Sequence, residues 1–493
     1  MRLARLIPAG VVLVALGAVA GAAQLTHPAS PAASPAATAS RQVAVTSAAR
    51  ACPPAQGGGP VALIARPAGA SGTSGSAMAG RVELTALPPA GATLRAASPV
   101  LAQSPGVLSL LTMPAGVSTG RHAPVAEGWS VAASGPIAQA VEAELAQSSG
   151  LASVRCGEPG SDIWFVGPGQ QNGAAQIHLD LMNIDSLAAS VNVTTITDAG
   201  QAQAGNDNGI TVPPHQTVTE SLSSMASGSS VVAVEVHTSI GRVAADVAES
   251  SPHGGTVSWL PSTAAPSTQL VIPGVLPSGS TAGLFVAVPG TASAKVNVIA
   301  ITPQGHYRPF GPQTVDLPGE SAVYVPLTPL GGTAAALEIT SNVPVAAAVL
   351  VPGNGVGAFA AATAPISEQA VIAGNTSGSG LAASVVLSAP AGAARVRLTE
   401  IAPGSSGASV TGSQVVPVRA GHTLVAPVTA PRGAKRGAAF AVVITPLAGS
   451  GPLYAARVET QDQNTIVSIL PAASALTTID LPPVRDSYTA ISP

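Results

Sequence analysis

The sequence predicts an all-β protein: tandem immunoglobulin- or fibronectin-like β-sandwich modules that follow an N-terminal hydrophobic helix. A pattern of about one hundred residues recurs along the chain. Hydrophobic residues make up 46% of the sequence but aromatic residues only 2%, so Val, Leu, Ile and Ala must fill the cores, and β-branched residues favour strands. The 53 Gly and 45 Pro residues are typical of short strands separated by turns. A closed four-unit, propeller-like ring is the alternative architecture, although propeller blades usually have about 40–50 residues.

The N-terminus has the pattern of an export signal. Arg2 and Arg5 form a short basic region, and the stretch from Leu6 to Ala23 carries no charge. As a helix this stretch is about 27 Å long, enough for a bilayer core. Residues 1–23 are therefore expected to be a signal peptide or a membrane anchor. Residues 24–50, rich in Pro, Ala and Ser, are expected to be a linker.

The repeat defines the expected modules. Val191–Ile196, Val296–Ile301 and Val396–Ile401 are apolar stretches at equivalent places in three copies, and a weaker copy includes Ser130–Ser134. We expect a degenerate N-terminal β module at 51–155 and β-sandwich modules at 156–262, 263–365 and 366–493, the last with a C-terminal tail.

Turns after these stretches also correspond. His215, Glu320 and His422 fall at equivalent elbow positions, where polar residues are expected to be solvated turn tips.

The alternation of apolar and polar residues predicts individual strands. Val82–Leu87 alternates as a half-buried strand does, whereas Ile137–Gln147 fits either a helix or a strand. Gln176–Leu181 alternates so that Ile177, Leu179 and Leu181 face the core, while His178 and Asp180 face outward.

Further strands are expected where the modules open. Ile163–Val166 is a strand near the start of the second module, and Gln269–Gly274 and Gln369–Gly374 open the next two. Thr478–Pro482 resembles these opening strands and could pair back onto the first module, closing the array.

Cys52 and Cys156 are the two cysteines of the chain. In an exported protein an isolated pair is most simply a disulfide. The chain-entropy model gives about 4–5 kcal/mol for closing a loop of about one hundred residues.

Charge and motifs argue against several classes of function. The net charge is −3 with no basic patch, which removes the electrostatic basis for binding nucleic acid. The chain has no HExxH, CxxC or P-loop motif, so we expect no cofactor, no metal and no catalytic residue. His178 and Asp180 share a strand face but lack a neighbouring nucleophile.

Three aromatic residues are the candidates for stacking on a ligand: Trp164, Trp259 and Tyr307. For Trp164, however, burial as a core anchor between the first two modules is the default expectation, because large aromatic residues dominate core energetics. A sugar-binding role predicts that at least one of the three is exposed, on a common face.

One passage resembles a known family. Cys156–Gly167, with Trp164 and Phe165 inside it, and Trp259–Pro261 later in the second module, are similar to an actinobacterial exported family, domain of unknown function 5719. The resemblance covers about residues 51–485. It implies a secreted or membrane-anchored protein with no assigned activity, so no functional residue is carried over.

Together these features predict a non-catalytic exported cell-envelope protein, a scaffold or interaction array of β modules outside the membrane. Its partners are expected to be an envelope protein or a cell-wall glycan, with membrane contact through the N-terminal segment. The alternative is a protein that binds cell-wall polysaccharide or peptidoglycan, and an exported hydrolase is the less favoured third hypothesis.

Overall fold

The structure is a computed structural model. It describes residues 41–54, 61–65, 81–92, 98–100, 109–112, 127–139, 141–146, 153–170, 176–204, 209–250, 257–276, 282–309, 314–327, 333–352, 357–375, 380–405, 409–461 and 465–481. The predicted helix at 1–23 and most of the predicted linker lie outside these residues. The one helical element of the described part is a short 3₁₀ turn, and no described helix could span a bilayer.

The chain divides into two compact units. In the smaller, β1 (Arg41–Ala44) pairs antiparallel with β36 (Thr478–Leu481). The sequence predicted a strand at this C-terminal position, which is confirmed, but its partner is β1 rather than a strand of the first module. The larger unit is Val45–Thr477.

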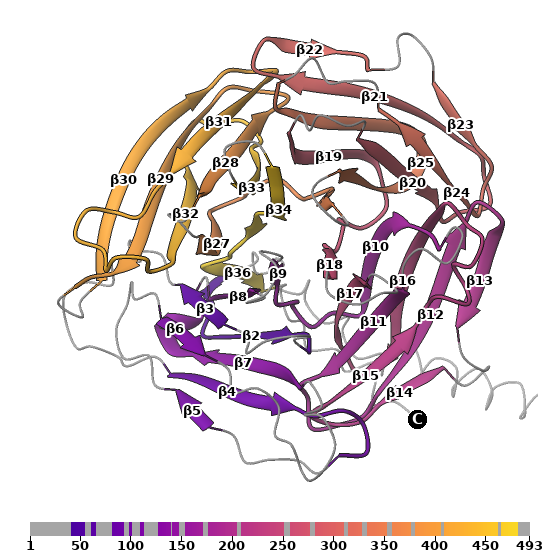
Figure 1. The fold of residues 1–493 in the computed structure, drawn as a ribbon, viewed down its shortest axis with the longest axis horizontal. Coiled ribbons are helices and arrows are strands. Elements are labelled where there is room, and N and C mark those ends of the chain that lie inside the picture. Colours follow the sequence, from indigo (N-terminus) through magenta and orange to yellow (C-terminus); the bar gives the residue numbers. More distant parts are fainter. Residues whose placement is uncertain are drawn as a thin grey trace, which may run out of the picture. The chain divides into compact units, whose positions relative to one another are not determined.

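Within the larger unit the strands form four modules of two sheets each (Figure 1). Module 1 comprises β2–β9, in sheets ordered β2-β7-β4-β5 and β6-β3-β8-β9. Its first strand begins inside the predicted linker, so the folded region starts before residue 51. The strands are β2 (Ser47–Cys52), β3 (Val61–Ala65), β4 (Arg81–Leu87), β5 (Ser98–Val100), β6 (Ser109–Thr112), β7 (Gly128–Ser134), β8 (Glu142–Ala146) and β9 (Ser153–Arg155).

Module 2 repeats this order, with sheets β10-β16-β12-β13 and β15-β11-β17-β18 and an additional strand, β14, that pairs with β12. The strands are β10 (Asp162–Pro168), β11 (Gln176–Asn183), β12 (Ala189–Thr197), β13 (Gly200–Ala204), β14 (Ile210–Val212), β15 (Gln216–Ser221), β16 (Val231–Ile240), β17 (Ala244–Ser250) and β18 (Val257–Leu260).

Module 3 keeps the order, but one long strand, β25, belongs to both sheets. Its first half pairs with β19 and β21, and its second half with β20 and β26. The strands are β19 (Ser267–Val275), β20 (Gly283–Val288), β21 (Ala294–Thr302), β22 (Gly305–Tyr307), β23 (Val315–Leu317), β24 (Ser321–Pro326), β25 (Ala335–Val351) and β26 (Ala358–Ala361).

Module 4 has sheets β30-β29-β32-β27-β35 and β31-β28-β33-β34. The strands are β27 (Ala370–Asn375), β28 (Leu381–Ala389), β29 (Ala394–Pro403), β30 (Ser409–Val418), β31 (His422–Val428), β32 (Phe440–Pro446), β33 (Tyr454–Gln461), β34 (Thr465–Pro471) and β35 (Ala473–Ser474).

The predicted all-β class is therefore confirmed for the described residues. Each module has two sheets over a shared apolar core, as in a β-sandwich, whereas a propeller blade is a single four-stranded sheet. In module 2, Ile177, Leu179 and Leu181 lie in that core as predicted. Because Val45–Thr477 forms one compact unit, the partition into separate domains remains a prediction.

The ambiguous stretch 137–147 contains both kinds of structure. Gly135–Ala138 forms the 3₁₀ turn, and β8 begins at Glu142. Pro136, near the start of the turn, suits a helical N-terminus because it has no N–H to satisfy.

The elbows before β15, β24 and β31 share an unusual backbone. His215 and Glu320 both have φ of 53°, and Gly421 has φ of 70°. The equivalent residue in module 4 is therefore Gly421, and the expectation for His422 is wrong by one residue. Left-handed backbone is costly for residues with a Cβ atom, so modules 2 and 3 retain strain that module 4 avoids.

The modules pack against one another in a closed order. Apolar clusters join modules 1 and 2, modules 2 and 3, and modules 3 and 4, and a buried ion pair joins module 4 to module 1. The apolar clusters contain Leu87 and Met182, Trp164 and Phe285, and Val298 and Val386, respectively, and the ion pair joins Glu144 to Arg457.

Candidate functional site

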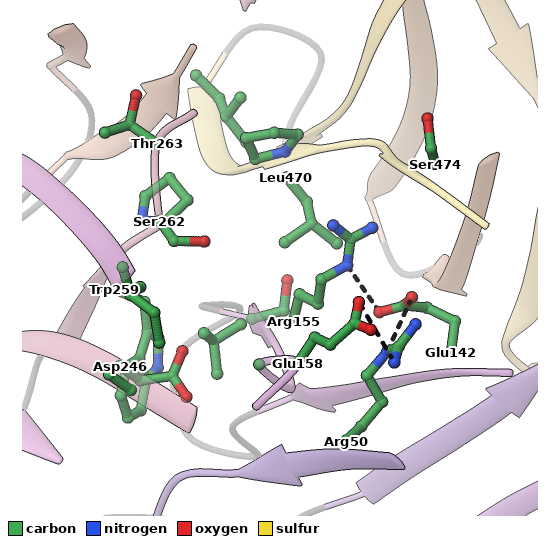
Figure 2. A pocket seen from close by; sticks show the side chains of 18 of the residues that line it. Arg50, Glu142, Arg155, Glu158, Asp246, Trp259, Ser262, Thr263, Leu470 and Ser474 are labelled. Carbon is green, nitrogen blue, oxygen red and sulfur yellow. Dashed lines mark hydrogen bonds and ion pairs between the residues drawn. The ribbon is translucent and has the colours of Figure 1, made fainter. Parts of the chain in front are cut away.

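A cavity of about 280 Å³ lies where modules 1, 2 and 4 meet (Figure 2). Its walls come from β9 of module 1, the end of β18 and the residues after it, and β34 of module 4. The equivalent strands β9, β18, β26 and β34 of the four modules lie close together, since β18 contacts β26, β26 contacts β34, and β34 contacts β9. The cavity is therefore built by the packing of modules, not within any one sandwich.

One wall carries a network of charges. Arg155 Nε donates a hydrogen bond of 2.7 Å to Glu142 Oε1, and Arg50 Nε lies 3.8 Å from Glu142 Oε2. A second nitrogen of Arg50 lies 3.7 Å from Glu158 Oε2. Figure 2 shows both guanidinium groups converging on Glu142. Glu142 is buried, so two cations compensate the cost of removing its charge from water.

The cavity also collects buried polar atoms that have no protein partner. They are Arg155 Nη2, Trp259 Nε1 and Asp246 Oδ2. Asp246 is 5% exposed and Trp259 7% exposed, and in Figure 2 the two lie together on the wall opposite Glu142. Buried polar atoms normally have a hydrogen-bond partner, so three unpartnered atoms on residues that line one cavity make this cavity the candidate ligand site.

Asp246 lies in a second, acidic environment. It is directly opposite Asp180 in the antiparallel pair of β17 and β11. Burial, and secondarily the charge of Asp180, raises the pKa of Asp246 well above its usual value. Burial also raises the pKa of Asp180 to about 6, even though the Thr219 hydroxyl donates a 2.6 Å hydrogen bond to it. The environment of Asp246 therefore favours its protonated form, which can donate a hydrogen bond as well as accept one.

Asp180 does not face solvent, contrary to the sequence prediction. Its strand face packs on module 1, where Met182 and Ala244 share an apolar cluster with Ala51 and Leu87. Alternation correctly divided the two faces of β11, but the second face is covered by another module.

Beside the cavity, a buried ion pair joins module 4 to module 1. Arg457 Nη1 lies 2.5 Å from Glu144 Oε1, and both side chains are almost fully buried. Arg457 also donates to the Gly374 carbonyl, to Ser153 Oγ and, at 3.0 Å, to Ser468 Oγ. The Gly374 N–H donates to Glu144 Oε2 at 2.7 Å. Removing one partner of such a pair leaves an uncompensated buried charge, so this joint is energetically sensitive.

The predicted disulfide is confirmed. Cys52, at the end of β2, is bonded to Cys156, which follows β9. The bond ties the first and last strands of module 1 together, and both strands contribute to the cavity. Such bonds persist in oxidising compartments.

The three predicted stacking residues do not form a common exposed face. Trp164 is buried between modules 2 and 3, where it clusters with Phe285, rather than between modules 1 and 2. Tyr307 is half-buried against the core of module 3. Trp259 is buried too, but it lines the cavity, so it is the one candidate that the structure places at a potential ligand site.

Sequence reasoning missed Arg50, Glu142, Arg155 and Asp246 because they come from distant parts of the chain. One repeated motif in the sequence could have pointed to the cavity. Val257–Pro261, of sequence VSWLP, recurs in module 4 as VSILP at Val467–Pro471. These segments form the equivalent strands β18 and β34, and both line the cavity.

Comparison with known proteins gives a family but no activity. No curated protein matches the chain. Residues 120–429, more than half of the sequence, match the family of unknown function DUF5719. This range contains the end of module 1 from β7 onward, all of modules 2 and 3, and the first half of module 4. The chain therefore belongs to the DUF5719 family of unknown function.

Proposed function

We propose that the protein is a non-catalytic, exported component of the cell envelope that works as a scaffold or interaction array outside the membrane. The observation that carries the proposal is the recurrence of one two-sheet topology in four modules of a single compact unit. Repeated modules of this kind present similar surfaces at regular intervals, which suits binding of extended or multiple partners.

Export is supported by two features that are independent of each other. The Cys52–Cys156 disulfide suits an oxidising compartment, and residues 1–23 have the charge and apolar pattern of a signal or an anchor. Residues 1–23 would direct the chain across the membrane. This segment would then either be cleaved or stay in the membrane as a single helix.

Partner binding is supported by apolar residues on strands at sheet edges. Tyr324 on β24 is 40% exposed and Val415 on β30 is 46% exposed. Both strands end their sheets in modules 3 and 4, so part of each backbone is open to pairing with another chain.

Site-specific photocrosslinking in intact cells tests this proposal. Tyr324 and Val415 are each replaced, in the tagged full-length chain, by p-benzoylphenylalanine, with the buried Phe440 replaced as the control. We expect discrete protein adducts from Tyr324 or Val415 and none from Phe440. Absence of adducts at both edge positions, or a cytoplasmic protein with reduced Cys52 and Cys156, would contradict the proposal.

The alternative, binding to cell-wall glycan, is favoured by the position of Trp259 in a polar cavity, while the burial of Trp164 counts against an aromatic binding face. Co-sedimentation of the full-length protein with isolated sacculi distinguishes the alternatives. Saturable pelleting that a soluble wall fragment competes away supports glycan binding, and absence of pelleting at micromolar protein rules it out.

A further inference from the structure

We propose that the cavity between modules 1, 2 and 4 is a binding site for a neutral, hydroxyl-rich ligand of monosaccharide size. This site goes beyond the scaffold role proposed above and does not depend on it. Its ligand is either a free sugar or the terminal residue of a glycan chain, which share the same hydroxyl chemistry.

The unpartnered atoms specify the hydrogen bonding of the ligand. Arg155 Nη2 and Trp259 Nε1 are obligate donors, so the ligand must offer acceptors to both walls of the cavity. Asp246 Oδ2, which is buried and unpartnered, can accept or donate according to its protonation. Hydroxyl groups satisfy all three atoms, because each hydroxyl is both donor and acceptor.

The charges of the cavity disfavour an anion. Arg50 and Arg155 both already lie against Glu142, and Arg50 also lies near Glu158. Asp162 adds a further carboxyl group to the lining. A phosphate or carboxylate ligand would find no uncompensated cation, so a neutral ligand is the better match.

The remaining walls suit the apolar faces of a sugar ring. Trp259, Pro261, Ile469, Leu470 and Pro471 line the cavity beside the polar groups. Ligand sites are characteristically apolar pockets with a few placed polar groups. A volume of about 280 Å³ lies at the small end of ligand pockets, which usually have about 300–1,000 Å³, so it suits one sugar ring better than a longer ligand.

Ligand-detected NMR on the full-length protein tests the site. The probes are glucose, galactose, mannose and N-acetylglucosamine, with glucuronate and glucose 6-phosphate as anionic comparisons. A short N-acetylglucosamine oligomer distinguishes a glycan terminus from a free sugar, since the terminus predicts that the oligomer binds more tightly than the monomer.

Matched variants locate the binding. Trp259→Phe keeps a buried aromatic ring but removes the Nε1 donor, and Arg155→Lys keeps the charge beside Glu142 but removes Nη2. Each is expected to weaken binding about tenfold, the effect of one lost hydrogen bond. Trp164→Phe is the control, because Trp164 Nε1 is also buried and unpartnered but lies outside the cavity lining.

The proposal predicts that at least one neutral probe binds, that Trp259→Phe and Arg155→Lys weaken it, and that Trp164→Phe leaves it unchanged. Failure of all neutral probes to bind, preference for the anionic probes, or an equal loss in Trp164→Phe would overturn it. If Trp259→Phe fails to fold, Arg155→Lys decides the outcome. The photocrosslinking result is independent of these measurements, so the scaffold role and the sugar site can fail separately.

Discussion

At the scale of single residues, the stability of this protein depends on a few buried charges in a chain that has little charge. Charged residues make up only 9% of the sequence, yet Glu142, Glu144, Asp246 and Arg457 are all buried where modules meet. Burying a charge is costly unless it is paired, so these positions are expected to be far more sensitive than surface charges.

Arg457→Leu is expected to lower the free energy of unfolding by about 3–5 kcal/mol, because it leaves Glu144 buried without its partner. The double variant Glu144→Leu/Arg457→Leu is expected to recover part of this loss, since it removes the closest buried pair but also removes the cation that lies 4.0 Å from Glu459 Oε2. Arg242→Leu, which breaks the exposed pair with Asp185, serves as the control and should cost less than about 1 kcal/mol. Urea unfolding measures all three, and equal effects of the two single variants would contradict the account.

Buried acids also predict a pH dependence. Burial raises the pKa of Glu249 to about 7 and that of Asp180 to about 6. The folded state therefore binds protons more tightly than the unfolded chain, whose carboxyl groups have pKa values of about 4. Between about pH 4 and pH 7, the free energy of unfolding should therefore be greatest at the low end and should fall as the pH rises.

Glu249→Gln is expected to stabilise the protein at pH 8 by on the order of 2–3 kcal/mol and to flatten the decline. Asp316→Asn, at an exposed position, is the control and should follow the wild-type profile. The measurement is the free energy of unfolding of each variant from pH 4 to pH 8. A wild-type free energy of unfolding that increases from pH 5 to pH 8 would refute the raised pKa values of the buried acids.

At the scale of elements, the repeat extends to backbone conformation. The elbows before β15, β24 and β31 are left-handed, with His215, Glu320 and Gly421 at the equivalent position of modules 2, 3 and 4. Gly421→Ala is expected to lower the free energy of unfolding by about 1 kcal/mol, because alanine is strained in a left-handed backbone. The added Cβ would lie 3.8 Å from its nearest neighbour, an ordinary contact, so no steric clash adds to this cost. Glu320→Gly, in contrast, should not destabilise module 3. Thermal unfolding of both variants measures this, and a neutral Gly421→Ala would count against the strain argument.

Much of the fold could be predicted at this scale. Alternation identified β4 and β11, because local polarity records which face a strand buries, and the repeat identified the strands equivalent to Val191–Ile196. Alternation could not say what covers the other face, so Asp180 was expected in solvent and is instead buried, on the strand face that Met182 packs against module 1. The cavity could not be predicted at all, since Arg50, Asp246 and Leu470 are brought together only by packing between modules.

At the scale of the whole large unit, module 4 packs directly on module 1, and this contact completes the cavity. Residues 153–155 and 469–471 supply two of its walls, so the cavity exists only if these segments meet. The contact includes two serine hydroxyls, Ser153 Oγ and Ser468 Oγ, which lie 3.0 Å apart.

The most direct test is therefore an engineered cross-link. Because Cys52 and Cys156 are already bonded to each other, Ser153→Cys/Ser468→Cys introduces the two additional thiols of the folded protein. The hydroxyl separation is compatible with disulfide geometry, so we expect these thiols to oxidise to an intramolecular bond, seen as loss of free thiol and an unchanged monomer mass on a non-reducing gel. Ser153→Cys/Ser413→Cys, with the second thiol on the exposed edge strand β30, should keep both thiols free. Two reactive thiols in folded Ser153→Cys/Ser468→Cys would contradict the closed packing, and the cavity with it.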